Sequence, residues 1–170
     1  MSTDTQFWWE DMTPGTVRDL GQHTISAEEI IDFAEQFDPQ PFHLSEDGAR
    51  DSVFGRLCAS GWHTCSLAMR LMVRNFLRYS ASLGSPGLES VKWLKPVYPA
   101  DTLRLEHHIL ESRPMNSRPD VGLVRTVWKM FNQHGEQVLH MEGYGMFRRR
   151  TPGTPGVPAA AASTPASPRA

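Results

Sequence analysis

The sequence predicts a single α+β domain in which an antiparallel sheet curls around one long, apolar helix. Residues 62–79 contain no glycine or proline, and their apolar side chains occupy several helical faces, which is typical of a buried helix. The second half of the chain holds four consecutive segments with the alternation of strands. A chain of 170 residues can form one core without a disulfide or a metal. The strands would supply the surface that the helix needs.

The first helix is expected to begin after Ser26 and to end at Asp38, following a short extended segment in residues 14–21. Ser26 and Glu29 have the spacing of a capping box. An apolar stripe at helical spacing follows: Ile30, Ile31, Phe33, Ala34 and Phe37. Asp38 precedes a proline, which disfavours the α conformation, so the helix should stop at this carboxylate.

A turn and a short second helix are predicted next. Residues 39–41 form a proline-rich turn, and Ser45, followed by two acidic residues, indicates a capped helix running toward residues 53–54. We expect this piece to pack over the cleft that follows the first helix. The long helix should then run from Gly61 to about Tyr79.

Four strands are predicted, separated by residues that favour turns. They are Leu88 to Tyr98, Thr102 to Glu111, Val121 to Asn132 and Gln137 to Arg148. The turns are expected at residues 99–101, 114–119 and 132–135. Pro96 inside the first strand indicates a bulge or an edge. His107 and His108 should point to opposite faces of the sheet, so they cannot both join one site.

Composition and charge argue against several classes of protein. The net charge is -2, with basic residues spread along the chain, so we expect no nucleic-acid partner. Two cysteines, Cys58 and Cys65, and an N-terminus without a basic start or an apolar run indicate a reduced, cytoplasmic protein. No apolar segment approaches the roughly 20 residues that span a bilayer, so no membrane partner is expected.

The chain is expected to divide into a domain of residues 1–150 and a tail of residues 151–170. The tail is rich in proline, alanine, serine and glycine and lacks large apolar residues, so we expect it to be disordered. Three arginines at the junction, residues 148–150, are interpreted as a solvated strand end rather than as a patch for nucleic acid or membrane.

Asp38 and His43 are the candidate catalytic pair. The first helix would deliver the carboxylate, and the proline-rich turn would bring the imidazole to the same point in a cleft. This is the arrangement that a general acid and base require. The alternative is that Asp38 only ends a helix and His43 is a partly exposed loop residue.

Residues 37–43, Phe-Asp-Pro-Gln-Pro-Phe-His, resemble the hydratase motif of the MaoC-like dehydratases, a family that includes the R-specific enoyl-CoA hydratases of fatty acid metabolism. That motif runs aromatic, short spacer, Asp, any residue, Asn, Pro, aliphatic, His. Gln40 replaces the asparagine and Phe42 the aliphatic residue. Residues 55–62, GRLCASGW, resemble the family's approach to its central helix, and residues 91–103, VKWLKPVYPADTL, its first long strand and turn. The resemblance covers about residues 7–150.

The resemblance implies a hot-dog fold, in which the sheet wraps around the helix from Gly61, and a homodimer or higher homo-oligomer. It also implies hydration of a 2-enoyl thioester, or dehydration of a 3-hydroxyacyl thioester, carried by CoA or acyl carrier protein. In the family, the residues matching Asp38 and His43 hold a water for syn addition to the double bond. The backbone N–H matching Gly61 binds the thioester oxygen. We expect no cofactor.

Such a hydration needs a base, an acid and a donor for the developing enolate oxygen. A histidine titrates near neutral pH, so His43 is the expected base, whereas Asp38 could act as the acid only if a dry site raised its pKa. Gly61 would present free N–H groups and the positive end of a helix dipole to the oxyanion; alternatively, it only begins the helix. Ser60 is a second candidate substrate-binding residue, although as an N-cap its role should be mostly structural.

Other groups of reactive residues are interpreted structurally. Cys58, His63 and Cys65 lack a fourth ligand, so no metal site is expected. Three arginines at intervals of four, Arg70, Arg74 and Arg78, are interpreted as a solvated helical face rather than a site for CoA phosphates. Two other functions remain open on the same fold, namely a thioesterase in which Asp38 activates water and a non-catalytic acyl-binding subunit.

Overall fold

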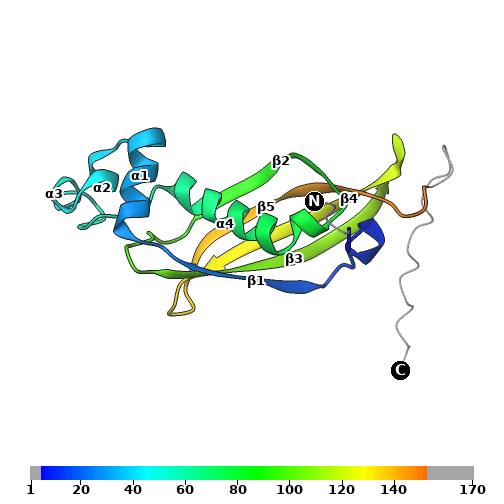
Figure 1. The fold of residues 1–170 in the computed structure, drawn as a ribbon, viewed down its shortest axis with the longest axis horizontal. Helices are drawn as coiled ribbons and strands as arrows, with labels where there is room; N and C mark the ends of the chain where they lie inside the picture. The colour runs from blue at the N-terminus through cyan, green and yellow to red at the C-terminus, as the bar shows by residue number, and fades with distance from the viewer. Residues whose placement is uncertain (1–4, 153–170) are drawn as a thin grey trace, which may run out of the picture.

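Residues 5–152 are described in a computed structural model (Figure 1). The predicted tail lies almost wholly outside these residues. The elements in chain order are η1 Trp9–Asp11, β1 Val17–Thr24, α1 Ala27–Phe37, α2 Pro41–Leu44, α3 Glu46–Ala49, α4 Gly61–Asn75, η2 Leu77–Tyr79, β2 Ser82–Trp93, β3 Thr102–Met115, β4 Arg118–Phe131 and β5 Gln137–Arg148. None of the described helices is long and apolar enough to cross a membrane.

The five strands form one antiparallel sheet in the order β1-β3-β4-β5-β2, and α4 lies lengthwise against one face of it (Figure 1). This confirms the predicted α+β layout. The expected extended segment before α1 is β1, which pairs with β3 and makes one edge of the sheet. The other edge is β2.

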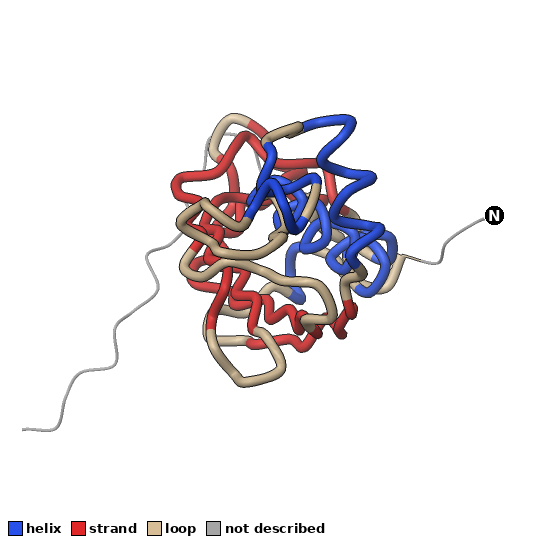
Figure 2. Tube along the Cα trace, turned by 90° about the vertical axis from the view of Figure 1, so that its left-hand side faces the viewer, coloured by secondary structure: helices blue, strands red, loops and turns tan. Residues whose placement is uncertain are grey.

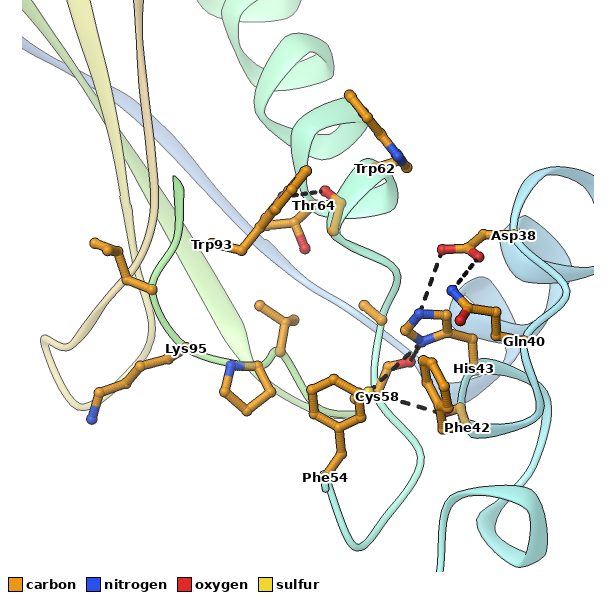
Figure 3. Close-up of a pocket in the computed structure, with 15 residues that line it drawn as sticks. Asp38, Gln40, Phe42, His43, Phe54, Cys58, Trp62, Thr64, Trp93 and Lys95 are labelled. Carbon is orange, nitrogen blue, oxygen red and sulfur yellow. Dashed lines mark hydrogen bonds and ion pairs between the residues drawn. The ribbon is translucent and has the colours of Figure 1, made fainter. Parts of the chain in front are cut away.

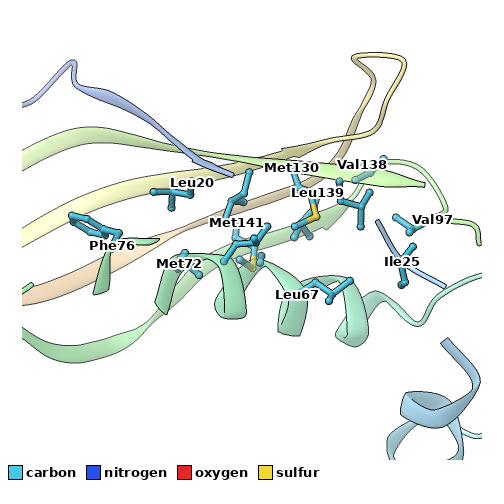
Figure 4. Close-up of a cluster of buried hydrophobic side chains, with 14 of the residues drawn as sticks. Leu20, Ile25, Leu67, Met72, Phe76, Val97, Met130, Val138, Leu139 and Met141 are labelled. Carbon is cyan, nitrogen blue, oxygen red and sulfur yellow. The ribbon is translucent and has the colours of Figure 1, made fainter. Parts of the chain in front are cut away.

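The core fills the space between α4 and the sheet (Figure 4). Its central members on the helix are Leu67, Met72 and, just beyond the helix, Phe76, and on the strands Met130, Leu139 and Met141. The opposite face of α4 is exposed, so the expectation of a mostly buried helix is only half right. The helix also ends earlier than expected, because the backbone leaves the helical region at Phe76 (φ −146°) and continues as η2.

Several predicted strand boundaries are wrong: β2 begins earlier, at Ser82, and the other differences lie near prolines. Strand β2 ends at Trp93, so Pro96 lies outside it. The loop expected at residues 114–119 is shorter: only residues 116–117 form the turn, and β3 includes Pro114 while β4 includes Pro119. At these positions the outer neighbours have already stopped pairing: β1 pairs with β3 only as far as His108, and β5 pairs with β4 only from Val121. A missing N–H therefore breaks no ladder bond there.

The three short helices α1, α2 and α3 lie beyond the N-terminal end of α4, at one end of the sheet (Figure 1), and in the end-on view the helices gather on one side of the strands (Figure 2). The predicted capping box is present, since the Ser26 hydroxyl accepts from the Glu29 N–H and Glu29 accepts from the Ser26 N–H. Two details differ from the prediction. The proline-rich turn continues into the helix α2, which contains His43, and the helix capped by Ser45 stops at Ala49.

Candidate active site

Three segments meet at the N-terminal end of α4 and line a cavity of about 460 Å³ (Figure 3). Asp38 is the residue that ends α1, His43 lies in α2, and Gly61 is the first residue of α4. All three line the cavity. The structure therefore brings the predicted catalytic pair and the predicted oxyanion donor to one place.

Asp38 is held by two donors. Its Oδ1 accepts from the side-chain amide of Gln40 at 2.8 Å, and its Oδ2 accepts from the Ser60 hydroxyl at 2.6 Å. Burial alone would raise the pKa of Asp38, but these hydrogen bonds and the nearby His43 together lower it below its ordinary value. Asp38 is therefore ionised in the free protein. It could act as the acid only with a raised pKa, and its pKa is lowered instead.

His43 is buried, and its two ring nitrogens have different surroundings. The Nδ1 atom lies 2.7 Å from the carbonyl oxygen of Cys58, and because a carbonyl can only accept, Nδ1 carries the proton and donates. In the neutral ring, Nε2 is then an acceptor, and it lies 3.5 Å from Asp38 Oδ2. The rings of Phe42 and Phe54 pack beside the imidazole. His43 is thus fixed in tautomer and orientation, which a partly exposed loop residue would not be.

Gly61 begins α4, and its N–H precedes the first turn, so it has no carbonyl acceptor within the helix. The indole of Trp93 packs on Gly61, with Nε1 donating to the Gly61 carbonyl at 2.8 Å. A Cβ on residue 61 would lie 2.6 Å from this indole, so only glycine fits beneath it. The N-terminus of α4 is therefore both open to the cavity and walled by Trp93.

Ser60 is completely buried and is not among the residues that line the cavity. Its hydroxyl accepts from the Trp62 N–H as the N-cap of α4 and donates to Asp38. Ser60 therefore links the helix that presents Gly61 to the carboxylate at the end of α1. Its geometry is that of a positioning residue rather than of one that contacts a substrate.

Two lining residues of the site were not singled out by the sequence. Trp93 and Thr64 both line the cavity. Trp93 was read only as part of a predicted strand, and neither alternation nor spacing shows that its ring folds back over Gly61. Thr64 lies one turn into α4, at a position where a helical pattern indicates only burial.

The remaining reactive residues have structural surroundings. Cys58 is buried, and burial raises the pKa of its thiol to about 11. His63 stacks on Phe33 with ring centroids 4.5 Å apart. No group of three side chains able to hold a metal ion occurs among residues 5–152. The arginines at 70, 74 and 78 are exposed and do not line the cavity, and Arg70 pairs with Glu29, as expected for a solvated face.

The arrangement can hold and activate a water molecule. When the His43 ring carries its proton on Nδ1 alone, its Nε2 and the Asp38 carboxylate are both acceptors, so a water placed between them would donate one hydrogen to each and turn a lone pair of its oxygen toward the cavity. A carbonyl oxygen placed at the N-terminus of α4 would meet the Gly61 N–H and the positive end of the helix dipole. The candidate base, the carboxylate and the candidate oxyanion donor thus line one cavity.

Residues 11–127 match the family described as MaoC like domain. The MaoC-like dehydratase from Rhodospirillum rubrum is 39% identical, with a TM-score of 0.80 over 86% of this chain and 99% of that chain. The R-hydratase PhaJ1 from Pseudomonas aeruginosa shares the fold at 22% identity, with a TM-score of 0.69 over 91% of this chain and 97% of that one. Mesaconyl-CoA hydratase from Cereibacter sphaeroides is 39% identical over 64 residues, which are 38% of this chain and 18% of that protein.

Proposed function

Because the chain belongs to the MaoC-like dehydratase family and has its hot-dog fold, we propose that it adds water to a 2-enoyl thioester, or removes water from a 3-hydroxyacyl thioester, with (R) specificity. The observation that supports this most strongly is the convergence of Asp38, His43 and the Gly61 N–H on one cavity. An acyl-CoA is the proposed substrate. Mesaconyl-CoA hydratase, which matches part of the chain, is named for such a thioester.

The proposed reaction uses one water and one histidine. As the water oxygen attacks Cβ of the enoyl group, its proton passes to Nε2 of His43, and the Asp38 carboxylate stabilises the imidazolium. The negative charge that develops on the thioester oxygen is held by the Gly61 N–H at the helix N-terminus. The imidazolium then returns the proton to Cα, so that H and OH add from the same side. Asp38 remains ionised throughout, in keeping with its lowered pKa.

The test follows the loss of enoyl absorbance with crotonyl-CoA. Asp38→Asn and His43→Gln should each lower kcat by about 10²–10⁴-fold, the range expected when a general acid or base is removed. Asp47→Asn, which changes an exposed carboxylate on α3, is the matched control and should retain activity. Wild-type rates in both site variants would contradict the proposal.

The same assay separates the alternatives. Release of free CoA without a 3-hydroxyacyl product would identify a thioesterase. Saturable acyl-CoA binding without turnover at any chain length would identify a binding subunit. Chiral analysis of the 3-hydroxyacyl product tests the (R) assignment.

We also propose that the chain forms a homodimer through the outer face of α4 and the edge strand β2. This surface carries large exposed apolar side chains, namely Trp62, Met69, Val73, Leu88 and Trp93. An unpaired strand edge next to such a patch is a typical contact surface for a second copy. Sedimentation should show a dimer for the wild type and a monomer for Val73→Arg, and a monomeric wild type at micromolar concentration would contradict this arrangement.

A further inference from the structure

A second cavity, of about 440 Å³, lies between α4 and the far part of the sheet. Its size falls in the range of about 300–1,000 Å³ that is usual for small-molecule sites. Most of its lining is apolar, with Met72 and Phe76 on the helix side and Met141 and Phe147 on the strand side. Met69 and Leu88 of the proposed dimer surface line it as well. Gly145 also lines it, and its lack of a side chain leaves room beside Phe147. The cavity therefore suits an apolar chain.

Three buried polar atoms in this apolar lining have no hydrogen-bond partner within residues 5–152. They are Nδ1 of His107, Oγ1 of Thr126 and Nε1 of Trp128. His107 and Thr126 are each only 1% exposed. His107 on β3 is paired directly with Trp128 on β4, and Thr126 lies two residues earlier on the same face of β4, so the three form one cluster. Leaving buried polar groups unpaired destabilises a fold, which makes a cluster of three unusual.

The chemistry of the three groups defines the ligand that would satisfy them. An indole N–H can only donate, so the ligand must offer an acceptor, and Thr126 and His107 can each donate to the same group. Burial lowers the pKa of His107 to about 3, so the ring is neutral at physiological pH, and the cavity lining contains no lysine or arginine. A carboxylate would therefore find no cationic side chain in the lining to pair with. An uncharged oxygen, as in a hydroxyl or ketone group, fits better.

The second cavity lies next to the first along α4. Thr64 lines the first cavity and Cys65, the next residue, lines the second. Met72 follows Gly61 by eleven residues, which is about 16 Å along the helix axis. The ring of Trp93 packs on Gly61 and lines the first cavity. A thioester held at Gly61 would have to run its acyl tail along α4 over about this distance to reach the polar cluster.

We propose that His107, Thr126 and Trp128 recognise an uncharged oxygen on the acyl tail, so that the preferred substrate is an oxygenated acyl thioester rather than a plain hydrocarbon one. This selectivity depends on the proposed function only in that the thioester lies at Gly61. The hydrogen bonds are made by residues remote from Asp38 and His43. The selectivity can therefore be measured by binding alone.

The first experiment measures binding of saturated acyl-CoA ligands, which cannot be hydrated, to the full-length protein by calorimetry. Saturated ω-hydroxyacyl-CoA ligands with six, eight and ten carbons are each compared with the unsubstituted saturated acyl-CoA that has the same number of heavy atoms. At the length that reaches the cluster, the hydroxylated ligand should bind about tenfold more tightly or better, since a site with unpaired polar groups discriminates against a ligand that leaves them unpaired. The ω-carboxy ligand should bind more weakly than the hydroxylated one. No preference at any length would overturn the proposal.

The second experiment removes the polar atoms while keeping the shape. Thr126→Val and Trp128→Phe should each reduce the preference for the hydroxylated ligand to about twofold or less. Neither should lower Tm in the absence of ligand, because each removes a buried group without a partner. Thr102→Val, whose hydroxyl lies on an exposed part of β3, is the control and should keep the preference. Lower Tm values with an unchanged preference would show a structural role and overturn the proposal.

The two proposals fail in distinguishable ways. Turnover of crotonyl-CoA without any preference for an oxygenated tail would overturn only the inference about the second cavity. A preference in binding that depends on Thr126, in a protein that hydrates no enoyl-CoA, would overturn only the hydratase assignment.

Discussion

Asp38 owes its charge state to donors from different parts of the chain. Gln40 is two residues away, but Ser60 is twenty-two residues away and reaches Asp38 only because α4 begins beside the end of α1. The spacing of Asp38 and His43 was readable from the sequence, and so was the replacement of the motif's asparagine by Gln40. The lowered pKa of Asp38 and the tautomer of His43 could not be predicted from the sequence, since both depend on contacts that only the folded chain makes.

Ser60→Ala should raise the pKa of Asp38, because it removes the shorter of the two hydrogen bonds to the carboxylate. A carboxylate whose pKa is lowered on folding stabilises the protein above about pH 4, and this contribution is lost as the pH falls through the folded-state pKa. The variant should therefore be less stable at neutral pH. Loss of the α4 N-cap should lower its free energy of unfolding by about a further 1 kcal/mol. Carbon-13 NMR titration of the Asp38 carboxyl and urea unfolding measure the two effects.

Ser60→Thr is the matched control, since it keeps a hydroxyl that can both cap α4 and donate to Asp38. It should behave more like the wild type in pKa and in kcat than Ser60→Ala does. An unchanged Asp38 pKa in Ser60→Ala would show that the hydroxyl does not hold the carboxylate in solution.

At the scale of elements, two features of the sequence predicted the structure well: helix-capping residues and the alternation of apolar and polar residues along a strand. Ser26 with Glu29 located α1, and alternation located β5 to the residue. The start of β2 was missed because residues 82–87 are rich in glycine and serine, with two glycines at positive φ and register shifts against β5. The prolines at 114 and 119 were read as a loop, because a sequence does not show which strand edges lack a neighbour.

Gly61→Ala should displace Trp93, because the new methyl group would lie 2.6 Å from the indole ring. The displaced ring would change the wall of the first cavity and disturb the N-terminus of α4. We expect a loss of stability of about 1–3 kcal/mol, as for other overpacked positions, together with a large fall in kcat. Urea unfolding and tryptophan fluorescence check the prediction.

The Gly61→Ala/Trp93→Ala double variant provides the control for that clash. If the clash is the cause, the two substitutions should be strongly non-additive, because Trp93→Ala removes the atoms that the methyl group meets. If the changes in unfolding free energy of the two single variants simply add, the clash with Trp93 is not the cause, and Gly61→Ala acts through another part of the helix.

A second contact between elements involves the N-terminal segment. A Cβ on Gly122 of β4 would lie 1.9 Å from the ring of Trp9 in η1, so Gly122→Ala should expel that ring from its place on the sheet. Arg149, which lies over the same ring with its guanidinium 4.9 Å from the centroid, would lose its contact as well. We expect destabilisation of about 2 kcal/mol and a red shift of tryptophan emission. The shift should be absent when Gly122→Ala is made in a Trp9→Phe background.

At the scale of the whole molecule, the sheet order β1-β3-β4-β5-β2 determines which strands line the cavities. Local patterns predicted a sheet wrapped around α4, but they could not predict that the first strand would pair with the third or that β2 would be left at an edge. That order places the central strands β3 and β4, with His107, Thr126 and Trp128, deepest beneath the helix. Burial of polar side chains at these positions is thus a consequence of topology and not of local sequence.

Two of the buried histidines, His63 and His107, should make the stability of the whole fold depend on pH above the range in which carboxylates titrate. Burial lowers the pKa of His63 to about 4 and that of His107 to about 3, from an ordinary value of 6.5. As the pH falls below 6.5, the unfolded chain binds protons at both residues while the folded protein does not, so stability falls. Each histidine contributes a slope of about 1.4 kcal/mol per pH unit between 6.5 and its folded-state pKa.

His63→Phe should remove about half of this slope, because phenylalanine fills the same place against Phe33 and cannot be protonated. The free energy of urea unfolding, measured from pH 8 to pH 4.5, provides the test. The value at pH 8, where both histidines are neutral in both states, gives the packing effect of the substitution alone and serves as the internal control. If the variant keeps the wild-type slope, His63 is protonated in the folded protein, and its stacking against Phe33 must open at mildly acidic pH. If the slope is halved, the remaining half belongs to His107.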